Sequence, residues 1–248
     1  MLNASVDGGI GHLELNRPEV RNAINRELCE VMGRTLDEWA ARDDVRAVVI
    51  SGAGGKAFAA GADISELKDR THKESFLAWT QRLLQKVEDF PRPTIAAIDG
   101  YALGGGLELA LACDLRVAAK SAKVGLPEVT LGIFPSAGGS WRLPRLVGLG
   151  RAKELIFTGR IVDAEEASHW GLFEALVETD ALAEARRIAA LIAANSPLAV
   201  QVAKVSMNAL AKREVAAPVE WLGQALLFDS DDKRARMTAF LEKKAKKP

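Results

Sequence analysis

The sequence contains little cysteine or histidine and has no excess of charge of either sign. Two cysteines among 248 residues are too few for a disulfide framework or a cysteine-based zinc site, and the three histidines are widely scattered. The 33 basic residues balance the 33 acidic ones, so no overall charge attracts the chain to nucleic acid or to membranes. These absences argue against a protein-bound metal and mean that any anion site must be a local cluster.

Long hydrophobic runs are also missing. The most apolar stretch, residues 101–119, is interrupted by Glu108, Asp114 and Arg116, and no basic segment leads into an apolar one at the N-terminus. We therefore expect a cytoplasmic protein that binds neither membranes nor nucleic acid. A hydrophobic content of 48% and a mean hydropathy of +0.02 are typical of a globular protein with a sizeable core.

The hydrophobic pattern changes near residue 150. Before it, short β-rich runs alternate with helical stretches, which predicts an α/β fold with right-handed crossovers; after it, amphipathic helices follow one another. We expect two regions, an α/β core at 1–195 and a helical C-terminal region at 196–248. The predicted strands are 10–15, 46–51, 94–99, 115–118 and 174–178, and the predicted helices are 25–41, 151–158, 163–170, 180–194, 197–213 and 218–228.

Two glutamates stand in glycine-marked apolar stretches. Glu108 lies in GYALGGGLELALACD (100–114), and Glu128 lies in GLPEVTLGIFPSAGG (125–139). A buried carboxylate is costly unless it is paired or used, and Glu108 has no basic partner at helical spacing. Without a distant Arg or Lys, we expect its pKa to rise. Glu128 follows Pro127 and is also explained as a helix-start carboxylate. Spacing alone does not show whether the two face each other.

Two further segments offer free backbone amides. In FAAGADI (58–64), Asp63 is predicted to cap a short helix and to leave the amide of Ala62 free at the turn. Residues 104–106 form a Gly-Gly-Gly triplet that opens a predicted helix, where exposed amides and the helix dipole suit an anion. Close packing between helix and strand explains the triplet equally well. Carboxyls beside free amide donors indicate acid/base chemistry on a carbonyl compound.

Taken in order, these segments resemble the enoyl-CoA hydratase/isomerase (crotonase) superfamily. The resemblance runs from LNRPEVRNAIN (15–25) through the motifs above to AFLEKKAKK (239–247) and so covers nearly the whole chain. It implies a crotonase-like α/β spiral of ββα units followed by a helical C-terminal trimerisation region, with trimers often paired as hexamers. It also implies an acyl-CoA thioester substrate and no separate cofactor, since CoA is part of the substrate.

The resemblance also assigns roles. The amides of Ala62 and Gly105 would form the oxyanion hole for the thioester oxygen. Glu108 would deprotonate a water that attacks C3 of a trans-2-enoyl-CoA, and Glu128 would supply the proton to C2, as in fatty-acid or related acyl-CoA degradation. The CoA portion would contact the backbone of Ala60, Asp63 and Ile64, with cationic help from Arg21, Lys56 and Lys243, although each cation is also explained as an ordinary exposed side chain.

Two alternatives stay open at this point. Isomerases of the superfamily commonly keep only the glutamate at the position of Glu128, so retention of both glutamates favours hydration without excluding isomerisation. A noncatalytic scaffold could use the basic tail at 243–247 on RNA, but the zero net charge and the two retained carboxyls weigh against it. Ser136 and Trp141 depart from the hydratase pattern. We expect Ser136 to crowd the catalytic water. The bulky Trp141 would either narrow the acyl pocket or pack in the core, and we expect it to pack in the core.

Overall fold

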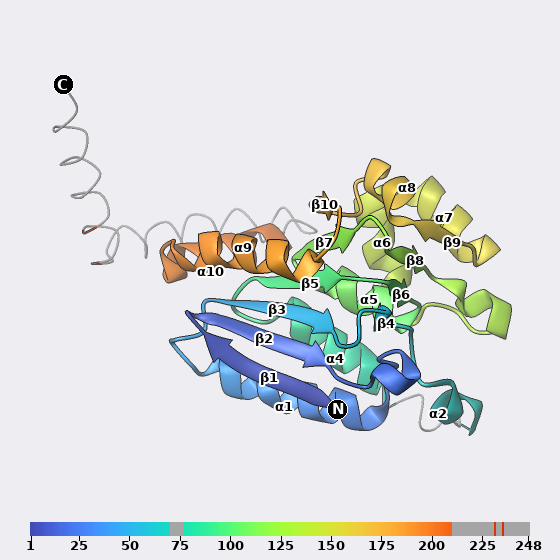
Figure 1. The fold of residues 1–248 in the computed structure, drawn as a ribbon, viewed down its shortest axis with the longest axis horizontal. Helices are drawn as coiled ribbons and strands as arrows, with labels where there is room; N and C mark the ends of the chain where they lie inside the picture. The colour runs from blue at the N-terminus through green and yellow to red at the C-terminus, as the bar shows by residue number, and fades with distance from the viewer. Residues whose placement is uncertain (70–76, 210–230, 232–234, 236–248) are drawn as a thin grey trace.

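Two β-sheets organise the fold, and helices cover both faces of the larger one (Figure 1). The computed structural model describes residues 1–69, 77–209, 231 and 235. The larger sheet has the order β1-β2-β3-β5-β7-β10, in which only β1 and β2 are antiparallel. Its strands are β1 (Leu2–Asp7), β2 (Ile10–Leu15), β3 (Ala47–Gly52), β5 (Thr94–Ile98), β7 (Leu115–Ala119) and β10 (Ala175–Val177).

The smaller sheet has the order β4-β6-β8-β9, with β9 antiparallel to β8. Its strands are β4 (Ala57–Ala59), β6 (Tyr101–Leu103), β8 (Lys123–Gly125) and β9 (Ile161–Asp163). The helices are η1 (Pro18–Val20), α1 (Arg26–Ala40), α2 (Ile64–Asp69), α4 (Trp79–Glu88), α5 (Gly105–Ala112), η2 (Pro127–Leu131), α6 (Gly139–Val147), α7 (Leu149–Thr158), α8 (Ala164–His169), α9 (Ala181–Ala193) and α10 (Pro197–Asn208).

Three successive turns of the chain repeat one pattern. Each adds a strand to the larger sheet, then a strand to the smaller sheet, then a helical segment: β3-β4-α2, β5-β6-α5 and β7-β8-η2. This repetition is the spiral of ββα units that the family resemblance implied. The helical segments after β4, β6 and β8 begin at neighbouring positions, because their strands pair in parallel. Residues distant in sequence are thereby brought to one edge of the smaller sheet.

The larger sheet is buried on both faces, which explains why its central strands are continuously apolar. In β3, Ala47 and Val49 pack with Ala185 of α9, whereas Val48 and Ile50 belong to the main core beneath α1 and α4. Successive strand residues point to opposite faces, so every position of β3 from Ala47 to Ile50 meets a core. Figure 1 shows α9 and α1 on opposite sides of this sheet.

Most of the predicted elements are confirmed, with ends that differ by a few residues. The predicted strand 174–178 is β10, and the helices predicted at 151–158, 163–170 and 180–194 are α7, α8 and α9. The sequence pattern missed β1. It also missed all four strands of the smaller sheet, because a strand of three residues is too short to show alternation. The predicted helix at 197–213 is described as α10 as far as Asn208, and the one at 218–228 lies outside the described residues.

A buried ion pair fastens α10 to the core. The ammonium of Lys204, which is 6% exposed, donates to Asp114 Oδ2 over 2.7 Å and to the carbonyl of Arg92 over 3.1 Å. Asp114 in turn accepts hydrogen bonds from the amide and the hydroxyl of Thr94. The first helix of the predicted C-terminal region is therefore joined to the α/β core by specific polar contacts, and the boundary at residue 196 stays a prediction.

No single helix among the described residues has both the length and the hydropathy to cross a membrane. Of the described helices, only α9 and α10 taken together have the required length and hydropathy, and that pair is bent by 110°. The inner side of α9 is already buried against the larger sheet. Nor do the described ranges contain a group of three or more His, Cys, Asp or Glu side chains placed to hold a metal ion.

Candidate active site

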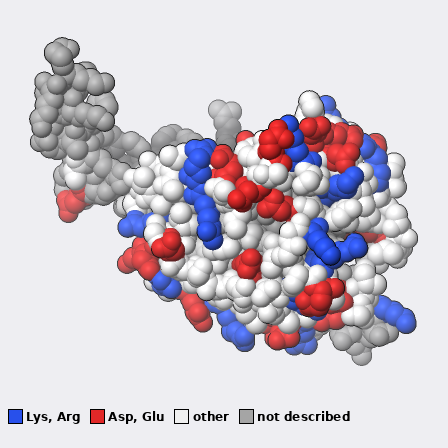
Figure 2. Space-filling model, in the orientation of Figure 1, with Lys and Arg blue, Asp and Glu red and all other residues white. Residues whose placement is uncertain are grey.

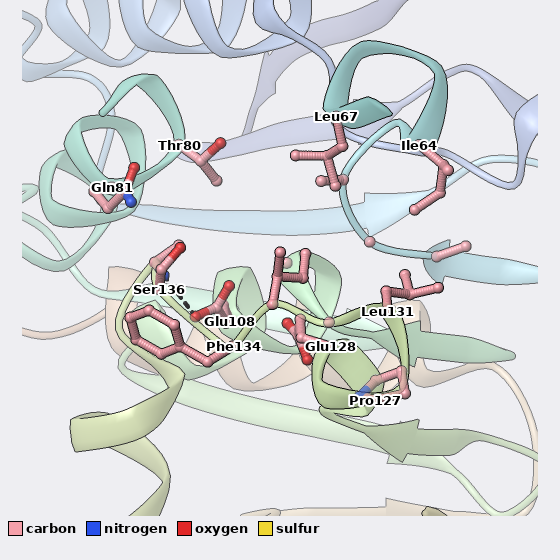
Figure 3. Close-up of a pocket in the computed structure, with 17 residues that line it drawn as sticks. Ile64, Leu67, Thr80, Gln81, Glu108, Pro127, Glu128, Leu131, Phe134 and Ser136 are labelled. Atoms are coloured by element: carbon pink, nitrogen blue, oxygen red, sulfur yellow. Dashed lines mark hydrogen bonds between the residues drawn. The ribbon is translucent and has the colours of Figure 1, made fainter. Parts of the chain in front are cut away.

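One pocket brings both glutamates and both free amides together. It has a volume of about 120 Å³ and lies where the segments after β4, β6 and β8 meet α2 and α4. Glu108 and Glu128 lie on one side of it, and Ile64, Leu67 and Thr80 lie on the opposite side (Figure 3). The remaining lining is mostly apolar, as expected for a cavity that holds an acyl group. The two glutamates are 20 positions apart in the sequence, and the rest of α5, β7, β8 and their connections lie between them.

Glu108 is held firmly by the backbone of the loop before α6. It is 4% exposed on α5, and its Oε1 accepts hydrogen bonds from the amides of Ala137 over 2.7 Å and Gly139 over 2.8 Å. No described residue donates to Oε2, which remains available to a ligand in the pocket. Burial raises the pKa of Glu108, as the sequence predicted, while the two amides and the nearby Arg142 act in the opposite direction.

Glu128 has the opposite environment, with little to stabilise its charge. It follows Pro127 at the start of η2, and its Oε2 is buried without a hydrogen-bond partner among the described residues. Its Oε1 lies beside Gly104, where an added Cβ would come within 3.1 Å of that oxygen. Burial, together with the neighbouring charge of Glu108, raises the pKa of Glu128 to about 7. Near neutrality Glu128 can therefore hold a proton while Glu108 accepts hydrogen bonds.

The amides of Ala62 and Gly105 both lie at this pocket. Ile24 pairs with the neighbouring backbone groups, since its amide donates to the carbonyl of Gly61 and its carbonyl accepts from Asp63. The amide of Ala62 thus lies on the other edge of this segment, and no described carbonyl accepts from it or from the amide of Gly105. An added Cβ on Gly105 would lie 3.5 Å from the nitrogen of Ala62, so the two donors are neighbours.

Glycine is required at the turns that place these amides. Gly61 has φ +108° and Gly104 has φ +51°, a region that residues with a Cβ rarely adopt. Gly104 is followed directly by the first residue of α5, so the free amide of Gly105 lies at the positive end of the helix dipole. Both donors and this dipole favour negative charge at one spot, which is what an oxyanion hole needs.

Most of the residues predicted to bind through their backbone line the pocket. These are Ala60, Ala62, Ile64 and Gly105. Asp63 caps α2 as predicted, because its Oδ1 accepts from the amide of Ser65 over 3.2 Å, and it also forms a 3.0 Å ion pair with Arg17.

The predicted cations do not line the pocket. Arg21 is exposed, and its carbonyl accepts from the amide of Ala60, which places it next to the pocket-lining segment. Lys56 is exposed directly before β4. Lys243 lies outside the described residues. Contacts of these three side chains with CoA stay predictions.

Of the two residues that depart from the hydratase pattern, only Ser136 reaches the pocket. Ser136 lies beside Glu108 (Figure 3), and its effect on a catalytic water stays a prediction. The expectation that Trp141 packs in the core is wrong, because its side chain is 39% exposed. Leu143 and Arg142 are on the buried side of α6, and the Trp141 ring on the outer side stacks against the guanidinium groups of Arg142 and Arg145, at 4.1 and 4.8 Å from its centroid.

Three residues of this region were not predicted from the sequence. Thr80 and Gln81 of α4 line the pocket, although α4 carries no motif that indicates a site. Arg142 is 5% exposed and lies behind Glu108. A charged residue between apolar positions of an amphipathic helix was the available signal for Arg142, since buried charges are normally paired.

Comparison with known proteins agrees with this fold. The sequence profile described as enoyl-CoA hydratase/isomerase matches residues 5–247. The chain is 39% identical to the short-chain-enoyl-CoA hydratase of Clostridium acetobutylicum, over 96% of this chain and 93% of that protein. It is 41% identical to the crotonyl-CoA hydratase of Syntrophomonas wolfei, over 94% and 91%. The crystal structure of an enoyl-CoA hydratase from Bacillus anthracis superposes with a TM-score of 0.93 at 38% identity, over 98% and 96%. The chain therefore belongs to the enoyl-CoA hydratase/isomerase family and has the crotonase fold.

Proposed function

We propose that the protein is an enoyl-CoA hydratase, which adds water across the C2=C3 double bond of a trans-2-enoyl-CoA to give a 3-hydroxyacyl-CoA. The observation that carries this proposal is the meeting of two carboxyls of different character and two unused backbone amides in one pocket. The hydratase names of similar proteins from Clostridium acetobutylicum and Syntrophomonas wolfei support it, and they favour a short acyl group.

The proposed mechanism divides proton transfer between the two glutamates. Glu108, whose Oε1 is fixed by two amides, presents Oε2 as the base that takes a proton from water while the water oxygen bonds to C3. Glu128, with a pKa of about 7, gives its proton to C2. The hydroxyl and hydrogen added to the substrate together make up one water, so a single proton transfer between the two glutamates restores the site. Opposite protonation states of two neighbouring carboxyls match these opposite roles.

The amides of Ala62 and Gly105 stabilise the intermediate charge. As oxygen adds to C3, negative charge develops on the thioester oxygen until C2 is protonated. Two amides without other backbone acceptors can donate to that oxygen without first breaking a bond, and loss of one such donor costs about 10²- to 10³-fold in rate in other enzymes. Without these two amide donors, the negative charge on the thioester oxygen would lose this stabilisation while the two carboxyls transfer protons.

The first test is hydration of crotonyl-CoA, followed as loss of absorbance, with product analysis. We expect 3-hydroxybutyryl-CoA from the wild-type protein and severe loss of rate in Glu108→Gln and Glu128→Gln. No turnover with short, medium or aromatic enoyl-CoAs, or a Glu128→Gln variant as fast as wild type, would refute the proposal. An isomerase would instead convert a 3-enoyl to a 2-enoyl thioester without a hydroxyacyl product, and product analysis separates the two.

The family resemblance leads us to propose a trimer or a dimer of trimers, located in the cytoplasm and working without a cofactor. Support for association comes from large apolar side chains exposed on α9 and α10, including Leu191, Val205 and Met207. The face in Figure 2 does not suggest an RNA-binding surface, since basic and acidic side chains are intermixed over it. The tail at 243–247 lies outside the described residues. Light scattering together with size-exclusion chromatography measures the oligomeric state directly.

A further inference from the structure

A buried ion pair lies directly behind the loop that holds Glu108. Arg142 of α6 is 5% exposed, and its Nη2 and Nε donate to Oε2 of Glu88, the last residue of α4, over 2.6 and 3.2 Å. Its Nη1 donates to the carbonyl of Ala137 over 2.9 Å. Every hydrogen bond of this guanidinium therefore goes either to Glu88 or to the residue whose amide binds Glu108.

The guanidinium also fixes the peptide next to Ala137. An added Cβ on Gly138 would lie only 2.0 Å from Nη1 of Arg142, so the charged group is packed directly against this glycine. Gly138 lies between the two amide donors to Glu108, Ala137 and Gly139. Arg142 thus contacts the turn of backbone that carries both donors, so a change in its position should disturb them.

We propose that Arg142, held in place by Glu88, is a positioning residue for the catalytic base Glu108. It acts through the 137–139 backbone and not by contact with substrate, since Arg142 does not line the pocket. The inference rests on the proposed hydratase function for its kinetic consequence. Its structural part, the placement and protonation of Glu108, depends only on the contacts described above.

Few charges face Glu108, which makes the effect of Arg142 measurable. The charged groups that act on it are Arg142 from α6 and Glu128 from η2, while Glu88 from α4 lies behind Arg142. Strands β4, β5 and β6, which also pack against α5, are built from uncharged residues. Arg142 lowers the pKa of Glu108 against the effect of burial, so removal of the guanidinium should raise that pKa.

The chain offers a closely matched control. Arg116 of β7 is 2% exposed, pairs with Glu174 over 2.6 Å and donates to the carbonyls of Leu172 and Cys113 over 2.9 Å each. It is therefore a second buried guanidinium that ties one glutamate to backbone carbonyls, and it does not line the pocket. Arg116→Met and Glu174→Gln should cost stability comparable to Arg142→Met and Glu88→Gln without moving Glu108.

The experiment compares crotonyl-CoA hydration and thermal unfolding in these four variants and in Arg142→Lys. A displaced catalytic group costs about 10²-fold in rate, so we expect kcat to fall about 100-fold in Arg142→Met and about 10-fold in Glu88→Gln, with KM nearly unchanged. Arg142→Lys should recover part of the loss. The acidic limb of the kcat/KM profile should move to higher pH in Arg142→Met only, because the base would then ionise later.

A wild-type kcat and pH profile in Arg142→Met would overturn the inference, and so would an equal fall of kcat in Arg116→Met. A carbon-13 NMR titration of the Glu108 carboxyl gives a readout without turnover. A higher Glu108 pKa in Arg142→Met but not in Arg116→Met supports the inference, and an unchanged pKa contradicts it. If the wild-type protein hydrates no enoyl-CoA, the proposed function fails while this titration still decides the role of Arg142.

Discussion

Replacing Glu128 with glutamine should stabilise the protein at alkaline pH while it abolishes hydration. Burial raises the pKa of Glu128 from an ordinary 4.5 to about 7, so the folded protein keeps a proton that the unfolded chain releases between these values. The wild-type protein therefore loses stability as the pH rises from about 4.5 to about 7. Glutamine has the shape of the protonated acid and never ionises, so the variant avoids this loss.

The size of the effect follows from that pKa difference. Each pH unit corresponds to about 1.36 kcal/mol, and 7 − 4.5 = 2.5 units, so the ionised carboxylate costs at most about 3.4 kcal/mol above pH 7. Glu128 is only half-buried and solvent screens part of its charge, which reduces the expected gain to about 2 kcal/mol. For a domain of this size that corresponds to a rise in Tm of roughly 4–8 °C.

The assay is thermal unfolding of wild type and Glu128→Gln between pH 4.5 and 8.5 at one protein concentration, because association would otherwise shift the Tm. The Tm difference should be near zero at the acidic end and largest above pH 7. Glu19→Gln is a matched control, because Glu19 also stands in a Pro-Glu-Val 3-10 helix, η1, but is exposed. A difference that does not change with pH, or one that Glu19→Gln reproduces, would refute this reasoning about Glu128.

Three further predictions concern the same pocket. The kcat/KM for crotonyl-CoA should decrease above about pH 7, since Glu128 then loses the proton that it donates; a rate that keeps rising to pH 9 would contradict its role as acid. Gly106→Ala should lower the free energy of unfolding in urea titrations by about 1–3 kcal/mol and should also lower kcat, because the new Cβ would lie 2.0 Å from the carbonyl oxygen of Ala59. A variant as stable as wild type would show that α5 can shift freely. Trp141→Ala should leave the KM for short enoyl-CoAs nearly unchanged, because this side chain does not line the pocket, and a large increase in KM would show that it contacts substrate.

The sequence predicted five of the six strands of the larger sheet, and the helices α1, α7, α8, α9 and α10, because their signals are local. Strand β3 is buried on both faces and so is continuously apolar, and the long helices show helical periodicity. The smaller sheet was missed because its strands have three residues each. Its existence depends on parallel pairing between turns of the spiral, which no short segment of sequence encodes.

The candidate site was predictable as a set of residues but not as an arrangement. Burial of Glu108 and the helix start at Glu128 followed from their neighbours in sequence, whereas their shared pocket depends on the spiral. Trp141 was placed in the core on the basis of its size alone, but its position on α6 turns it outward. Arg142 was missed because its partners come from α4 and from a loop, at separations that sequence periodicity does not report.

The most direct test of the central claim is the fate of solvent atoms when crotonyl-CoA reacts in water labelled with oxygen-18 and deuterium. Glu108 acting on water and Glu128 acting on C2 should give a product with one labelled oxygen at C3 and one deuterium at C2, and Glu108→Gln and Glu128→Gln should each form this product far more slowly. Mass spectrometry of the thioester measures both labels at once. A wild-type product without labelled oxygen, or undiminished labelling in either variant, would contradict the account.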